Sequence, residues 1–222
     1  GVVEKAEIDE LPARAAELAS VFAPGTTSGS ATIPLVPIDL GATCVNIDTA
    51  WFAEHRLAEP ETFEDLADVK SKDLAVLIDP TGSSTGASFM IATISAFGED
   101  GFAAYWKRLV DNGTRLVQGW SDAYNVEFTG ASKTGTRPIV LSYSTSPAFT
   151  ANDAGTASST RALLGTCSTQ VEYAGVLAGA ANPKGAQAVV NYLLSEEFQQ
   201  TIPDEMYMYP VDERIALPES WA

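Results

Sequence analysis

LAVLIDPTGSSTGASFMIATISAFG, residues 74–98, decides the fold, because it predicts a strand, a polar loop and a helix in direct succession. Its opening residues, 74–78, form an apolar run that is too short for a helix and typical of a strand buried on both faces. Asp79 ends that strand, and small residues fill the loop at 81–86. Apolar residues then recur at the i, i+4 and i+7 spacing of a helix with one buried face: Met90, Ile94 and Phe97.

The loop of this unit lies where a ligand can meet the start of a helix. The first backbone N–H groups of a helix lack internal partners and carry positive partial charge, so Ser83, Ser84 and Gly86 suit an anion or a polar ligand group. Small hydroxylated residues are also the ordinary caps of helices, and for the loop alone both interpretations stay open. The loop lacks the lysine of a nucleotide-binding P-loop.

Strands and helices alternate along the rest of the chain. Further strands are predicted at residues 33–36, 41–46, 115–118, 139–143 and 169–173. Helices are predicted at residues 4–22, 102–109 and 186–194. The alternation predicts an α/β fold with a mostly parallel sheet flanked by helices, and ligands of such folds bind beyond the carboxyl ends of the strands.

Aromatic residues near the ends of predicted elements extend the candidate site beyond the serine loop. Trp120 follows one predicted strand, Tyr143 ends the next and Phe149 comes soon after it, while Tyr207 lies in the C-terminal tail. Rings of this kind hold flat heterocycles by stacking and cations through the ring quadrupole. Each ring could equally serve to pack the core or a loop.

The charge balance narrows the class of partner. The chain of 222 residues has 29 acidic and 13 basic residues, which gives a formal net charge of −16. This charge argues against nucleic acid and anionic membrane surfaces. It favours a cationic ligand, to which Asp122 and Glu172 could supply carboxylates, but a solvated acidic surface explains the same balance. Apolar residues make up 45 % of the chain, but none of their runs approaches the roughly 18–20 residues of a membrane span.

Residues with catalytic or metal-binding chemistry do not form a recognisable pattern. His55 lies in a charged stretch, and the sequence contains no nucleophile motif of the GxSxG type. Cys44 and Cys167 lack metal-ligand spacing, and they are either the disulfide of an exported protein or two buried thiols. The sequence therefore predicts a binding protein without a cofactor rather than an enzyme.

Several motifs occur in a fixed order along most of the chain. They are TFEDLAD (62–68), DPTGSSTG (79–86), YWKRLVDNG (105–113), GWSDAY (119–124), VLSYSTSPAF (140–149), QVEYAGVL (170–177), LLSEEFQQTIP (193–203) and MYPV (208–211). Together they resemble the thiamine-binding proteins that deliver substrate to ATP-driven importers in bacteria. The resemblance covers residues 33–218.

This resemblance implies a class II periplasmic-binding-protein fold, in which two α/β lobes close over the ligand. Residues 1–36 are then a remnant of the first lobe and a connector, residues 37–170 are the second lobe, and residues 171–222 return to the first lobe. Members of the family carry a longer segment before this point, so the first lobe is expected to be incomplete in this chain.

The resemblance also implies a ligand and the residues that contact it. The ligand is thiamine or a thiamine phosphate, handed to an ABC transporter permease. Ser83 would hold a phosphate oxygen, Trp120 would open onto the cleft, and Tyr143 and Phe149 would contact the pyrimidine and the thiazolium. Tyr207 stands where the family has a tryptophan, which preserves stacking with less area.

Export is implied as well, with the protein either periplasmic or a cell-surface lipoprotein. An exported protein favours a disulfide between Cys44 and Cys167. Two other functions stay open: a binding protein for another cation, such as a polyamine or ferric iron, and a thiamine-processing enzyme. Ferric iron would need a cluster of tyrosinates and carboxylates, and an enzyme would need a nucleophile.

Overall fold

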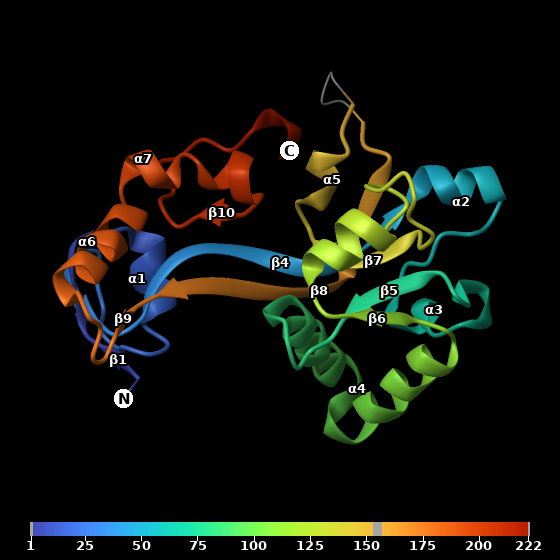
Figure 1. Ribbon diagram of the computed structural model, residues 1–222, viewed down its shortest axis with the longest axis horizontal. Coiled ribbons are helices and arrows are strands. Elements are labelled where there is room, and N and C mark those ends of the chain that lie inside the picture. The colour runs from blue at the N-terminus through green and yellow to red at the C-terminus, as the bar shows by residue number, and fades with distance from the viewer. Residues whose placement is uncertain (1, 153–156, 222) are drawn as a thin grey trace. The chain divides into compact units, whose positions relative to one another are not determined.

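The computed structural model describes residues 2–152 and 157–221 (Figure 1). Its internal contacts group the chain into two compact units, each of which has its own core. The units are Gly1–Gly41 with Val171–Ala222 (unit 1) and Ala42–Gln170 (unit 2). Two long strands, β4 (Val36–Asp48) and β8 (Thr160–Ala174), pair with each other, and each continues from one unit into the other.

Parallel strands form the centre of unit 2. β5 (Ala75–Ile78) pairs in parallel with β6 (Arg115–Val117) on one side and with β7 (Ile139–Tyr143) on the other. All four residues of β5 are buried, as expected for a continuous apolar strand covered on both faces. β4 adds antiparallel to the far side of β7, so the sheet is mixed at that point. The predicted α/β fold is confirmed.

Helices and short turns complete unit 2. They are α2 (Thr49–His55), α3 (Phe63–Leu66), η1 (Val69–Ser71), α4 (Ser84–Asp111), η2 (Asp122–Glu127) and α5 (Ser146–Phe149). Asp48 caps α2 by accepting a hydrogen bond from the Trp51 N–H, and Thr62 forms a reciprocal capping box with Asp65 at the start of α3. In the described part of the chain, none of the helices is both long and apolar enough to cross a membrane.

α4 contains the two helices that the sequence predicts, joined at a kink. Gly98 takes a φ of 73°, which breaks the helical geometry at that point. The Trp106 indole N–H donates to the Thr93 hydroxyl at 2.9 Å and so ties the two halves together. The predicted buried face is wrong in part, because Phe89 and Ala92 are buried. The positions named from the spacing are only half-buried: Met90, Ile94 and Phe97.

Unit 1 is built from short strands and helices of both chain ends. Its strands are β1 (Val3–Glu4), β2 (Ala6–Leu11), β3 (Gly29–Ile33), β9 (Val176–Leu177) and β10 (Tyr209–Pro210). Its helices are α1 (Ala13–Ala19), α6 (Pro183–Leu193), α7 (Glu196–Gln199), η3 (Ile202–Met206) and η4 (Glu219–Trp221). β1 pairs with β9, β2 with β3, and β10 with the part of β4 that belongs to this unit.

The helix predicted at residues 4–22 is wrong over its first half. Residues 6–11 form the strand β2, in which Ala6, Ile8 and Leu11 are buried, and only Ala13–Ala19 is helical. The segment AEIDEL reads as an acidic helix face, yet its first residues alternate with the period of two that a strand requires. Pro12 then separates the strand from the helix.

A disulfide joins β4 to β8 inside unit 2. Cys44 and Cys167 are bonded, across 123 positions of sequence. The neighbouring Val45 N–H donates to the Thr166 hydroxyl at 3.0 Å, so a hydrogen bond supports the same crossing. Because the bond closes a long loop, it restricts the unfolded chain more than a short-range disulfide would.

We expect the paired substitution Cys44→Ala with Cys167→Ala to lower the free energy of unfolding by about 2–5 kcal/mol, because the unfolded chain regains the freedom of the open loop. Urea unfolding followed by circular dichroism measures the change. Adding a reductant should destabilise the unsubstituted protein by a similar amount and leave the double variant unaffected. Equal stability of the two proteins without reductant would contradict the prediction.

Candidate functional site

The candidate site in unit 2 lies beyond the carboxyl ends of the three parallel strands. β5 ends at Ile78, β6 at Val117 and β7 at Tyr143, and because these strands are parallel their ends lie at one edge of the sheet. Each end leads into a short polar or aromatic segment. Ligands of α/β proteins bind at this edge, so the geometry of these three segments decides what the unit can hold.

The serine loop, residues 81–86, follows β5 and places the start of α4 at this edge. Ser83 is the N-cap residue, but in the described chain its side chain makes no capping hydrogen bond. Ser84 begins the helix and is exposed. Gly86 packs so closely on the end of β5 that an added Cβ would lie 2.5 Å from the Ile78 carbonyl oxygen. The helix start is therefore held against the strand end, with a serine hydroxyl and the first backbone N–H groups of the helix, which have no partner within the helix, beside it.

A carboxylate also belongs to this loop. The Asp79 side chain accepts hydrogen bonds from the Thr81 N–H at 2.8 Å and from the Thr81 hydroxyl at 2.7 Å. These two bonds, together with one from Gln118, lower the pKa of Asp79 below its usual value. The loop therefore combines an anion with a helix start, and the two favour ligand groups of opposite charge.

Trp120 and Tyr124 form a stacked pair after β6. Their ring centroids are 4.9 Å apart with an angle of 12° between the ring planes. Phe149, which is 54 % exposed, meets Tyr124 edge-on at 6.0 Å. The Trp120 indole N–H donates to the Ser142 hydroxyl at 2.8 Å. Trp120 is half-buried, so the part of the ring that stays exposed offers a ligand apolar surface rather than a hydrogen bond.

Tyr143 connects the end of β7 to the start of α4. Its hydroxyl lies 3.1 Å from the hydroxyl of Thr85, one residue after Ser84. Its backbone N–H donates to the Ser146 hydroxyl at 3.1 Å, and its carbonyl accepts from the Asn46 side chain at 3.0 Å. The structure thus brings the serine loop, Tyr143 and Trp120 into one bonded assembly.

Tyr207 belongs to unit 1 and is described there alone. It follows η3 with a φ of 55°, a left-handed conformation that is uncommon for a side chain of this size. Its ring stacks on Trp221 at a centroid distance of 6.3 Å, and Tyr209 meets the same indole edge-on at 5.1 Å. Unit 1 therefore carries an aromatic cluster of its own.

Asp39, also in unit 1, is a buried carboxyl group that the sequence did not single out. It is 1 % exposed, and its Oδ1 atom has no hydrogen-bond partner within residues 2–152 and 157–221. Burial, helped by the nearby charge of Glu172, raises the pKa of Asp39 to about 7. Glu172, predicted as a carboxylate for a cationic ligand, thus acts on a second acid in the same unit, while Asp122 is exposed in unit 2.

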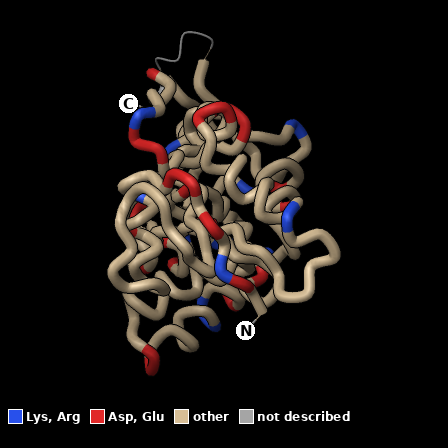
Figure 2. The backbone as a smooth tube through the Cα atoms, turned by 90° about the vertical axis from the view of Figure 1, so that its left-hand side faces the viewer, with Lys and Arg blue, Asp and Glu red and all other residues tan. Residues whose placement is uncertain are grey.

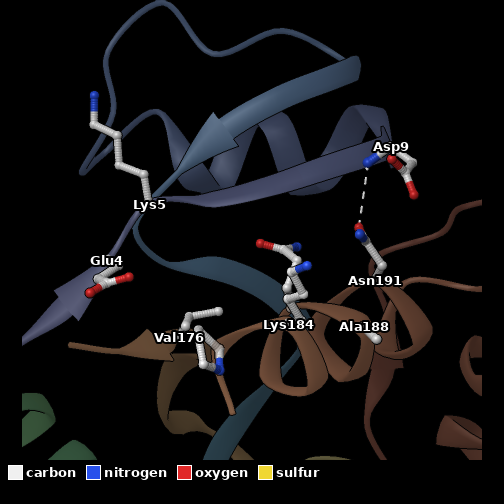
Figure 3. A pocket seen from close by; sticks show the side chains of 9 residues that line it. Glu4, Lys5, Asp9, Val176, Lys184, Ala188 and Asn191 are labelled. Carbon is white, nitrogen blue, oxygen red and sulfur yellow. Dashed lines mark hydrogen bonds between the residues drawn. The ribbon is translucent and has the colours of Figure 1, made fainter. Parts of the chain in front are cut away.

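A pocket of about 630 Å³ lies in unit 1 against α6 (Figure 3). Its lining mixes both signs of charge, including Glu4, Lys5 and Lys184, and Figure 3 shows the Lys5 side chain extending away from α6. The amide of Gln187 accepts from the Glu7 N–H and donates to the Glu7 carbonyl oxygen, while the amide of Asn191 donates to that same oxygen and accepts from the Asp9 N–H. These bonds tie α6 to β2. Among the residues that the structure describes, the lining of this pocket includes none of the predicted ligand residues.

Acidic residues are spread over the chain rather than gathered in one run. Figure 2 shows Asp and Glu on many separate segments, with fewer Lys and Arg between them. Most of the ion pairs are exposed, as in Lys107–Asp111 and Arg108–Glu64. The negative charge therefore acts as a general field that attracts cations, not as a single binding patch.

Hydroxyl groups that no sequence pattern indicated connect the predicted residues. Ser142 lies inside a predicted apolar strand, and Ser146 lies in the turn after it. A polar residue within a buried strand is a signal that a hydrogen-bond partner exists. The identity of that partner, Trp120, comes only from the tertiary structure.

Comparison with known proteins places these features in a wider group. A family profile described as "Bacterial extracellular solute-binding protein" matches residues 29–220. The thiamine-binding periplasmic protein of Escherichia coli (strain K12) is 29 % identical over 180 residues, which are 76 % of this chain and 52 % of that protein. The protein of that name in Haemophilus influenzae (strain Rd) is 34 % identical over 91 residues, 40 % of this chain and 25 % of that one.

Solved structures agree with the fold. A periplasmic thiamin binding protein superposes with a TM-score of 0.77 at 26 % identity, over 99 % of this chain and 63 % of that one. The periplasmic binding protein P5PA superposes with a TM-score of 0.76 at 17 % identity, over 100 % of this chain and 67 % of that one. The class II periplasmic-binding-protein fold is confirmed, and so is the resemblance that the motifs indicated. The chain spans about half the length of the Escherichia coli relative.

We expect the contribution of Asp39 to the stability of the protein to become less favourable as the pH rises from about 4 to about 7. Below the ordinary carboxyl pKa of 3.8, Asp39 is protonated in both the folded and the unfolded chain, so its ionisation makes no contribution to the free energy of unfolding. Between the two pKa values the unfolded chain releases a proton that the folded chain keeps, so unfolding is favoured as the pH rises. Asp39→Asn should raise the free energy of unfolding at pH 8 by on the order of 2 kcal/mol and change it little at pH 4.

Urea unfolding at pH 4, 6 and 8 tests this expectation. The exposed Asp122→Asn serves as the matched control and should leave the pH dependence unchanged. If Asp39→Asn destabilised the protein equally at all three pH values, the buried carboxyl would have a structural role. The predicted link between ionisation of Asp39 and stability would then be wrong.

Proposed function

The chain belongs to the bacterial extracellular solute-binding proteins, and from that membership we propose that it captures thiamine or a thiamine phosphate outside the cytoplasm for an ABC transporter. The names of the similar periplasmic proteins support the choice of ligand. In this proposal the protein binds its ligand without converting it and is exported. Residues 37–170 form the second lobe, and residues 1–36 and 171–222 belong to the first.

One observation carries the proposal: rings and hydroxyl groups from three separate segments meet beyond the ends of β5, β6 and β7. Trp120 and Tyr143 are joined through the Ser142 and Ser146 hydroxyls, and Tyr143 is joined to the start of α4 through Thr85. A site built from several segments at this edge of an α/β sheet is the usual place for a small-molecule ligand.

The chemistry of thiamine fits these groups. Its aminopyrimidine and thiazolium rings are flat, and the thiazolium carries a permanent positive charge. Flat aromatic faces attract such rings by stacking and by the interaction of a cation with the ring quadrupole. The formal net charge of −16 adds a long-range attraction for a cation. Phe149 supplies a further exposed ring, and Tyr207 is proposed as the contribution of the first lobe.

The start of α4 would receive the polar end of the ligand. Ser83 has a hydroxyl that does not cap its own helix, and the adjoining N–H groups favour a negative charge. Asp79, in the same loop, opposes a phosphate and favours the uncharged hydroxyethyl group of thiamine. The relative affinity for thiamine and thiamine monophosphate therefore reports the balance between these two groups.

We expect thiamine to quench the tryptophan fluorescence of the protein, and Trp120→Ala to weaken thiamine binding by about tenfold or more through loss of the stacking surface. Isothermal titration calorimetry gives the dissociation constant of each variant. Trp51→Phe is the matched control, because Trp51 lies in the same unit and stacks on His55 instead. Absence of thiamine binding by the unsubstituted protein, or unchanged affinity in Trp120→Ala, would contradict the proposal.

We expect Ser83→Ala to weaken the binding of thiamine monophosphate by roughly 3- to 10-fold and to change thiamine affinity less, because only the phosphate requires the hydroxyl. Competition titrations with both ligands measure the ratio. Ser95→Ala, an exposed serine further along α4, is the control. Equal losses for the two ligands would show that Ser83 does not contact the phosphate.

A further inference from the structure

A pair of buried serine hydroxyls connects the two principal residues of the proposed site. The Ser142 Oγ atom accepts the indole N–H of Trp120 at 2.8 Å, and the Ser146 Oγ atom accepts the backbone N–H of Tyr143 at 3.1 Å. The two serine oxygens are 2.7 Å apart and bonded to each other. The side chain of Trp120 and the backbone of Tyr143 are therefore linked through one short chain of hydrogen bonds.

Ser142 is a buried polar residue in an otherwise apolar part of β7, so its hydroxyl needs a hydrogen-bond partner. Its neighbours in β7, Val140 and Leu141, are completely buried, and Ser142 itself is 0 % exposed. Ser146 is 5 % exposed. An apolar residue at position 142 would suit such a strand, whereas a buried hydroxyl is unfavourable unless it is hydrogen-bonded. The Ser142 hydroxyl meets this requirement by accepting a hydrogen bond from the Trp120 indole.

Tyr124 ties the same two segments together a second time. Its ring stacks on Trp120, and its hydroxyl donates to the Ser146 carbonyl oxygen at 3.3 Å. One residue of η2 thus supports the indole ring and contacts the segment that follows β7. The indole is held at its N–H by Ser142 and along one face by Tyr124.

We propose that Ser142 and Ser146 are positioning residues, which fix the Trp120 ring and the Tyr143 backbone in a ready-made arrangement for a flat ligand. The part of this inference that concerns affinity rests on the proposed function. The hydroxyl pair does not contact the ligand. It removes the freedom of the indole to rotate, and a ring that is already ordered loses less entropy when a ligand stacks on it.

The arrangement also defines the class of ligand that Trp120 can select. Since its N–H group is occupied by Ser142, Trp120 recognises a ligand through its π-surface alone. Discrimination at this residue then depends on the flatness, size and charge of the ligand, not on a hydrogen-bond acceptor. Neutral and cationic heterocycles of similar outline should differ in affinity mainly through the cation–π term.

The test reads the position of the indole without any ligand. In ¹H–¹⁵N spectra of the full chain, the Trp120 indole resonance is identified by its loss in Trp120→Phe. We expect Ser142→Ala to move the indole proton upfield and speed its exchange with solvent. We also expect thiamine to bind roughly tenfold more weakly, because the N–H loses its acceptor. Ser142→Thr, which keeps a hydroxyl, should restore both properties.

Two further variants complete the test. Ser71→Ala removes a buried hydroxyl that donates to the Asp65 carbonyl in the same unit, and it should leave the indole resonance and the affinity unchanged. If Ser142→Ala fails to fold, Ser146→Ala decides the matter: the Tyr143 amide resonance should move upfield and thiamine should bind more weakly.

An indole resonance that Ser142→Ala leaves unchanged would overturn the inference, as would an unchanged thiamine affinity in a protein whose Trp120→Ala variant has lost binding. If the unsubstituted protein does not bind thiamine, the proposed function fails. The indole resonance then decides the positioning role alone, because it is measured on the free protein.

Discussion

Parallel pairing of β5 with both β6 and β7 is the constraint on which the rest of unit 2 depends. It places Val76 opposite Arg115 and Val140, so the three strands end together and their following segments meet. The apolar sequence of β5 permits this central position, because a strand with neighbours on both sides and helices over its faces has no contact with water. The positions of Ser83, Trp120 and Tyr143 at one edge of the sheet follow from those three endings.

Polar groups at this edge are arranged so that few remain free. The indole of Trp120, the backbone of Tyr143 and the hydroxyl of Thr85 are each paired within the protein. Burial makes such pairing strong, since water does not compete for the same donors and acceptors. What the edge leaves for a ligand is therefore ring surface, the start of one helix and the Asp79 carboxylate. Asp39 in unit 1 is the contrast, because its buried oxygen has no partner in the described chain.

Sequence patterns predicted the strands of unit 2 well and unit 1 less well. The run at 74–78 is a continuous apolar segment and the strand at 139–143 is interrupted only by Ser142, and runs of this length and composition are typical of buried strands. The prediction of a helix was wrong at residues 6–11, because acidic residues alternate with Ala6 and Ile8 in a way that also fits a helix face. The prediction of which side of α4 is buried was wrong for a different reason. The kink at Gly98 and the contact with the sheet decide which face of the helix is covered.

The candidate site also has a part that could be predicted from the sequence and a part that could not. Ser83, Trp120 and Tyr143 could be placed at strand ends from their order in the chain alone, and their role in binding stays a prediction. The role of Ser142 could not be assigned, because its partner Trp120 lies 22 residues away in the sequence, and Ser146 takes part only through its bonds to Ser142 and Tyr143. The raised pKa of Asp39 also depends on a neighbour from the far end of the chain, Glu172, which no local pattern reveals.

The covalent bond between Cys44 and Cys167 has a mechanical consequence. Both passages of the backbone between the units run through the bonded strands, β4 and β8. A pulling force applied at the two chain ends is carried from one strand to the other through the sulfur atoms. The intervening polypeptide, from residue 45 to residue 166, is shielded from that tension, so stretching can extend only the segments outside it.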